Sequence, residues 1–71
     1  MFEIEFAKRL RKIRLYRNLT QQKVADYLNI TRSAYSYYEL GKTEPNLQSL
    51  LKISRFFGVS TELLLTGKRK R

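Results

Sequence analysis

Two helix-start signals lie eleven residues apart near the middle of this 71-residue chain, at Thr20 and Thr31. Threonine suits the N-cap position because its hydroxyl accepts a backbone N–H that would otherwise be unpaired. An apolar residue precedes each threonine and another follows it four positions later, and such a pair fixes how the chain enters a helix. The pairs are Leu19 with Val24 and Ile30 with Tyr35. The pattern predicts two short helices, over residues 21–28 and 32–40.

Only Asn29 and Ile30 separate the end of the first of these helices from the cap of the second. A link this short does not let two helices run fully antiparallel, but it suits a crossed pair. We therefore expect a helix-turn-helix.

A further helix is predicted over residues 3–17. Phe6, Leu10 and Ile13 recur there with helical spacing and form one apolar stripe. Asn18 follows as the stop, because asparagine tolerates the left-handed conformation that ends helices.

The second half of the chain predicts two more helices. One covers residues 46–57, after Pro45 and before Gly58, and a short one is capped by Ser60 and ends at Gly67. Their inward-facing residues are expected to be Leu47, Leu50, Leu51, Ile53, Ser54 and Phe57, then Leu64 and Leu65. We expect an all-α fold, a compact five-helix bundle over residues 1–67, with a basic disordered tail over residues 68–71.

Positive charge dominates the composition. Fifteen Lys and Arg stand against six Asp and Glu, a formal net charge of +9, which favours a polyanion as partner. The chain has no Cys and no His, so we expect neither an enzyme nor a metal or other cofactor. It also lacks a secretory-signal pattern and the roughly 20 apolar residues of a membrane span. A cytoplasmic location is expected.

The helix predicted over residues 32–40 has two different faces. Ala34, Tyr35 and Tyr38 share the face expected to pack inward, and the other face carries Arg32, Ser33, Ser36, Tyr37 and Leu40. Arginine can bond bidentately to guanine, and serine can pair with several bases. We therefore expect Arg32, Ser33, Ser36 and Tyr37 to read bases in a DNA major groove. The alternative is the solvated face of an amphipathic helix.

The chain resembles the phage repressor and Cro-like helix-turn-helix family over residues 6–65. The likeness is carried by residues 19–25, residues 30–42, Pro45 and the Leu50-Leu51 pair at matching mutual spacing. It differs from the usual family pattern at Asn18, commonly glycine, and at Tyr37, commonly a basic or amide residue. The resemblance implies a DNA-binding domain of the lambda-repressor type.

Carried over position by position, the resemblance also implies roles for individual residues. Gln21 is expected to bond a phosphate and to help anchor the neighbouring recognition-helix side chain. Gly41, Lys42 and Thr43 are expected to approach the sugar-phosphate backbone. The resemblance implies base contacts from the same four residues, Arg32, Ser33, Ser36 and Tyr37.

Arg14 lies at the rim of the first apolar stripe, and Glu39 lies among aromatic residues near the end of the 32–40 helix. We expect the two to form a partly buried ion pair between helices, as the family analogy also suggests. The alternative is an exposed pair worth well under about 1 kcal/mol.

The sequence also predicts contacts to DNA phosphates and a dimeric state. Phosphate contacts are expected from Lys42, Arg9, Lys23 and the 68–71 tail, with a steep salt dependence. One such domain makes few contacts, so we expect a homodimer on a palindromic operator with half-sites roughly 34 Å apart. Phe56 and Leu63 are the interface candidates, as large apolar residues left outside the predicted core.

Other functions are compatible with the same fold. An antitoxin or adapter would chiefly bind a partner protein. A membrane-surface helix would bind anionic lipid through residues 8–12, but Leu10 and Ile13 of the same helix are needed in the core. RNA is disfavoured because its narrow major groove does not admit a helix. The prediction is a sequence-specific double-stranded DNA-binding transcriptional regulator, a repressor that acts through residues 32–40.

Overall fold

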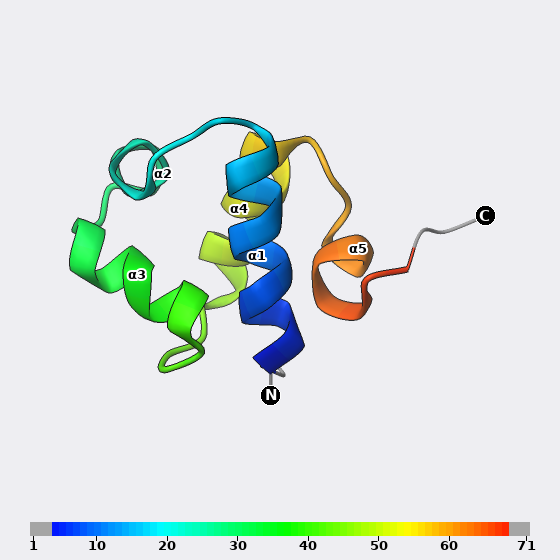
Figure 1. Cartoon of the computed structure of the whole chain (residues 1–71). Helices are drawn as coiled ribbons and strands as arrows, with labels where there is room; N and C mark the ends of the chain where they lie inside the picture. The colour runs from blue at the N-terminus through cyan, green and yellow to red at the C-terminus, as the bar shows by residue number, and fades with distance from the viewer. Residues whose placement is uncertain (1–3, 69–71) are drawn as a thin grey trace.

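Five helices make up the part of the chain that the computed structural model describes, residues 4–68 (Figure 1). In chain order these are α1 (Ile4–Tyr16), α2 (Gln21–Leu28), α3 (Arg32–Leu40), α4 (Leu47–Phe57) and α5 (Thr61–Thr66). The all-α prediction is confirmed. The tail predicted to be disordered lies, apart from Lys68, outside the described residues, as does the start of the first helix predicted at residue 3.

The helices begin and end at the residues that the local sequence favours. Four N-caps, each accepting a hydrogen bond from the backbone N–H three residues on, are Thr20, Thr31, Asn46 and Ser60. Asn18 adopts the left-handed conformation after α1, with φ 57°, as predicted. Asn29 does the same after α2, with φ 61°. The turn between α2 and α3 is thus as short as the spacing predicts.

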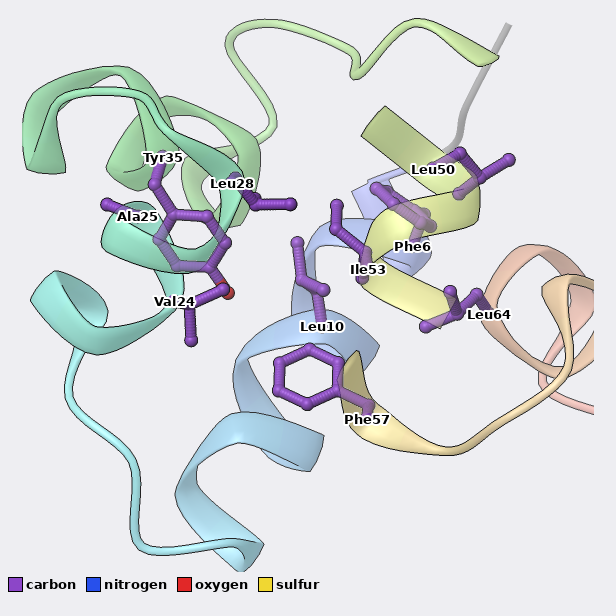
Figure 2. Packing of buried hydrophobic residues seen from close by; sticks show 10 residues of the cluster. All are labelled: Phe6, Leu10, Val24, Ala25, Leu28, Tyr35, Leu50, Ile53, Phe57 and Leu64. Atoms are coloured by element: carbon purple, nitrogen blue, oxygen red, sulfur yellow. The ribbon is translucent and has the colours of Figure 1, made fainter. Parts of the chain in front are cut away.

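One hydrophobic core joins all five helices (Figure 2). Figure 2 shows Leu10 near the middle of the cluster, with Tyr35 of α3 on one side and Ile53 of α4 on the other. Side chains with no exposed surface include Tyr35, Phe57, Leu10, Ile53, Leu64 and Val24. The residues before the caps, Leu19, Ile30 and Val59, are half-buried and pack against this cluster.

Two leucines of α4 lie outside the core, contrary to the prediction. Leu47 is 70% exposed and Leu51 is 39% exposed. The buried stripe of α4 is narrower, and it consists of Leu50, Ile53 and Phe57. Leu47 and Leu51 lie roughly 90–130° around the helix from the centre of that stripe, too far to reach the core.

Phe56 of α4 was expected to point away from the core, and it lies at the core's edge instead. It is half-buried, packs against the core cluster and stacks on Tyr27 of α2 with ring centroids 4.4 Å apart. The aromatic pair therefore ties α2 to α4. No helix within residues 4–68 is long and apolar enough to cross a membrane.

Candidate nucleic-acid interface

The crossing of α2 and α3 brings their N-terminal residues together. In Figure 1 α2 is seen nearly end-on while α3 lies across the view, so the two helices cross steeply. The exposed Nη1 of Arg32, the first residue of α3, lies 3.5 Å from Oε1 of Gln21, the first residue of α2. The side chains of the first residues of the two helices therefore meet.

The two faces of α3 are separated as the sequence predicts. Tyr35 is fully buried, and Tyr38 is half-buried in an edge-to-face contact with it, ring centroids 6.0 Å apart. Arg32 and Ser33 are exposed. Tyr37 and Ser36 complete the outer face, the first exposed and the second half-buried. The outer face is thus open to a ligand while the inner face anchors the helix.

The chain leaves α3 through a tight C-terminal cap. Gly41 has φ 75°, a left-handed conformation that favours glycine, and the N–H of Lys42 donates to the carbonyl of Tyr37 at 2.9 Å. Lys42 Nζ lies 5.6 Å from the centre of the Tyr37 ring. Gly41, Lys42 and Thr43 are all exposed. An exposed cation and an exposed glycine therefore lie beside the outer face of α3.

A buried ion pair lies beneath these exposed groups. Arg14 of α1 donates from Nε to Oε2 of Glu39 at 2.6 Å and from Nη2 to Oε1 at 3.0 Å. Both residues are only 7% exposed, so the pair expected from the sequence is present and is more deeply buried than expected. Arg14 Nη1 also donates to the carbonyl of Leu19 at 2.8 Å, which ties the end of α1 to the link before α2.

Glu39 accepts two further hydrogen bonds. The Tyr35 hydroxyl donates to its Oε2, and Gln21 Nε2 donates to its Oε1 at 3.1 Å. Burial alone raises the pKa of Glu39, but the hydrogen bonds from Arg14, Tyr35 and Gln21 outweigh it and hold the pKa below its ordinary value of 4.5. The pKa of Arg14 is raised, chiefly by its bond to Glu39, and burial raises that of Tyr35. Glu39 is therefore ionised at neutral pH.

Arg9, which was predicted to contact phosphate, bonds the backbone of α5 in the structure. Its Nε and Nη2 donate to the carbonyls of Leu64 and Leu65 at 2.9 and 2.8 Å. These carbonyls belong to the last turn of α5, where backbone acceptors lack helical partners. Arg9 therefore caps α5, whereas Lys23 is exposed as expected.

Sequence reasoning missed the polar role of Tyr35. The side chain was predicted only as a core anchor, yet its hydroxyl completes the set of donors around Glu39. The signal was present, because residues four apart on a helix face each other and Tyr35 and Glu39 have that spacing.

The candidate dimer-interface residues Phe56 and Leu63 are both half-buried.

Two crossed helices with buried inner faces, the second of which presents Arg and Ser at its N-terminus, define a helix-turn-helix domain of the DNA-binding type. The chain belongs to the phage repressor and Cro-like helix-turn-helix family of transcriptional regulators, whose family model, described as helix-turn-helix, matches residues 10–64. The resemblance inferred from the sequence is confirmed.

The relatives agree with this assignment. The SPbeta prophage-derived HTH-type transcriptional regulator YonR of Bacillus subtilis (strain 168) is 50% identical over 62 residues, covering 87% of this chain and 57% of YonR. The HTH-type transcriptional activator BcrR of Enterococcus faecalis is 43% identical over 65 residues, covering 92% of this chain and 32% of BcrR. The chain thus spans about half of YonR and about a third of BcrR. Both relatives are named as regulators of transcription and not as enzymes.

A solved structure supports the fold. The P22 c2 repressor protein, determined in complex with a synthetic operator, matches with a TM-score of 0.84 at 28% identity. The match covers 89% of this chain and 96% of that chain. The described helices therefore form the compact five-helix fold of phage repressors.

Proposed function

We propose that the chain is a sequence-specific regulator of transcription that reads double-stranded DNA with the outer face of α3, and that it acts as a repressor. The observation that carries the proposal is the exposure of Arg32 and Ser33 on a helix whose other face is anchored by the fully buried Tyr35. A helix fixed in this way presents its first turn as a rigid unit, as readout of base edges requires. DNA lies inside the cell, so the proposal includes a cytoplasmic location.

Base recognition is assigned to Arg32, Ser33, Ser36 and Tyr37. A bidentate bond from Arg32 to guanine O6 and N7 is worth roughly 1–3 kcal/mol of discrimination. The serine hydroxyls can donate or accept, and the Tyr37 ring can contact a thymine methyl group. Tyr37 also lies close enough to Lys42 for a cation–π contact, so its ring orients a cation as well.

Phosphate binding is assigned to Gln21, Gly41, Lys42 and Thr43. Gln21 opens α2, where backbone N–H groups and the helix dipole attract an anion. Lys42 is exposed just beyond α3, and the glycine before it lets a sugar-phosphate backbone approach closely. These contacts supply affinity that is independent of sequence and falls with rising salt.

A two-fold dimer on a palindromic operator, with half-sites roughly 34 Å apart, is part of the proposal. Phe56 and Leu63 stay its interface candidates. Because Phe56 already stacks on Tyr27 of its own chain, Leu63 is the residue to vary first. Sedimentation at low and high concentration, with and without DNA, tests the dimer, and a monomer under every condition contradicts it.

The proposal is tested by selection from randomised duplex DNA at moderate salt. We expect one palindromic sequence to be enriched and to be bound at least about a thousandfold more tightly than random competitor, the lower end for specific regulators. No enrichment would contradict the proposal and favour an adapter or antitoxin that binds a protein partner. A reporter gene placed behind the selected operator then tests repression, since BcrR is named an activator and the P22 c2 protein a repressor.

A further inference from the structure

The backbone of Tyr37 holds the chain that follows α3. Its carbonyl accepts from the N–H of Lys42 at 2.9 Å and from the N–H of Thr43 at 3.4 Å. Gly41, with φ 75°, makes the reversal that brings both donors back to this carbonyl. The segment proposed to bind phosphate therefore begins at a fixed point on the last turn of α3.

The side chain of Tyr37 contacts the same segment. Lys42 Nζ lies 5.6 Å from the centre of the Tyr37 ring, a separation at which a ring attracts a cation. Both side chains are exposed, and Tyr37 is 45% exposed. A lysine side chain on a protein surface samples many rotamers, and the ring favours those in which the ammonium lies beside the outer face of α3.

The ring contact is compatible with phosphate binding by the same lysine. An ammonium group carries three N–H donors, so the side of the group that faces away from the ring keeps donors for a phosphate oxygen. A lysine that is ordered before DNA arrives loses less rotamer freedom when it binds. The contact with Tyr37 therefore favours phosphate binding by Lys42 and does not compete with it.

We propose that Tyr37 is a positioning residue for Lys42, so that part of what Tyr37 contributes to DNA binding is independent of sequence and acts through the lysine. The inference rests on the proposed function and deepens it by coupling a side chain assigned to base contact with one assigned to phosphate. Either Tyr or Phe serves at position 37, because the face of an aromatic ring attracts a cation. An aliphatic side chain does not serve.

Three substitutions separate the ring of Tyr37 from its hydroxyl and from its bulk. Tyr37→Phe keeps the ring, Tyr37→Leu keeps an apolar side chain without a ring, and Lys42→Met removes the charge while keeping a long side chain. Tyr16→Leu is the matched control, because Tyr16 is 86% exposed and lies at the end of α1. Circular dichroism and thermal unfolding establish that each variant is folded.

Proton NMR of the free protein tests the contact without DNA. Protons held over an aromatic ring resonate upfield, so the ε-methylene protons of Lys42 report whether the side chain lies against Tyr37. We expect these resonances to move downfield in Tyr37→Leu and to keep their upfield position in Tyr37→Phe. Resonances that stay unchanged in Tyr37→Leu overturn the inference.

DNA binding is then measured with the selected duplex and with a duplex of random sequence at moderate salt. We expect Tyr37→Leu to weaken binding to the random duplex by about two- to fivefold, the size of an exposed cation–π contact. Tyr37→Phe and Tyr16→Leu are expected to bind the random duplex as the wild type does. In a Lys42→Met background, Tyr37→Leu is expected to weaken that binding no further, because its effect acts through the lysine.

The outcomes separate this inference from the proposed function. The inference alone is overturned if the loss in Tyr37→Leu is confined to one base pair of the selected duplex, or if it persists in full in the Lys42→Met background. An equal loss in Tyr37→Phe also overturns it, because the ring is kept in that variant. A wild-type protein that binds selected and random duplexes equally overturns the proposed function, and the coupling of Tyr37 to Lys42 is still measured on the random duplex.

Discussion

The hydroxyl of Tyr35 donates a hydrogen bond to Oε2 of Glu39, one helical turn further along α3. The two residues lie on the buried side of that helix, and Glu39 also accepts from Arg14 of α1 and Gln21 of α2. Three helices of the fold are thereby fixed to one carboxylate. The exposed face of α3 has a defined orientation because its buried face is held by both apolar packing and this polar centre.

Substitutions of Tyr35 and Glu39 are expected to lower the free energy of unfolding by different amounts. Tyr35→Phe deletes one donor and leaves Glu39 paired, so we expect the free energy of unfolding to fall by about 1–3 kcal/mol. Glu39→Ala leaves the Arg14 charge buried without its partner, which typically costs about 3–5 kcal/mol. Urea unfolding of both variants measures the difference. A smaller loss for Glu39→Ala than for Tyr35→Phe would contradict the assigned centre.

Stability is expected to depend on pH at both ends of the range. The pKa of Glu39 is lowered on folding, so its contribution is complete above the ordinary value of 4.5 and is lost as pH falls through the folded-state pKa. The pKa of Tyr35 is raised, so its contribution is complete below 10.0 and is lost as pH rises above it. Thermal melts from pH 2 to 11 test both losses of stability. Glu39→Gln should reduce the loss of stability at acid pH, and an unchanged loss would contradict the role given to Glu39.

Arg9 is expected to matter for α5 and not for DNA. Arg9→Ala removes two bonds to the carbonyls of Leu64 and Leu65, so amide hydrogen exchange should accelerate in α5. The salt dependence of DNA binding should stay the same, whereas a lost phosphate contact would lower its slope by about one. Lys8→Ala is the control, since Lys8 is exposed and forms an ion pair with the exposed Glu5 at 4.0 Å. A reduced slope specific to Arg9→Ala would restore the phosphate role.

The two leucines at the start of α4 are expected to behave differently. Leu50 is buried, and Leu50→Ala should lower the free energy of unfolding by about 2–5 kcal/mol. Leu47 is largely exposed, and Leu47→Ala should change the free energy of unfolding by no more than about 0.5 kcal/mol. Denaturant titration of the two variants under identical conditions measures both effects. Equal losses would show that Leu47 belongs to the core after all.

The helix ends were predictable because a cap depends on a few neighbouring residues. Thr20 and Thr31 needed only their own hydroxyls and the apolar residues around them. The ion pair between Arg14 and Glu39 was predictable because a charged residue at the rim of each of two apolar stripes has few other partners. Capping rules and helical periodicity therefore predicted the helix ends and the ion pair that support the site.

What could not be predicted depends on how helices approach one another. Helical spacing places the Tyr35 ring inside but does not say where its hydroxyl points. It also gives no sign that the end of α5 lies beside Arg9. The width of the buried stripe on α4, which leaves Leu47 exposed, is set by the neighbouring helices and not by α4 alone.

The central claim, that the outer face of α3 reads bases while the chain just beyond it binds phosphate, is tested most directly by comparing Arg32→Ala with Lys42→Ala. Both side chains are exposed, so both variants should keep the stability of the parent. In selection from randomised duplex DNA, Arg32→Ala is predicted to relax the preference at one base pair per half-site. Lys42→Ala is predicted to weaken binding to all sequences alike and to lower the salt slope by about one. Identical effects from the two substitutions would contradict the account.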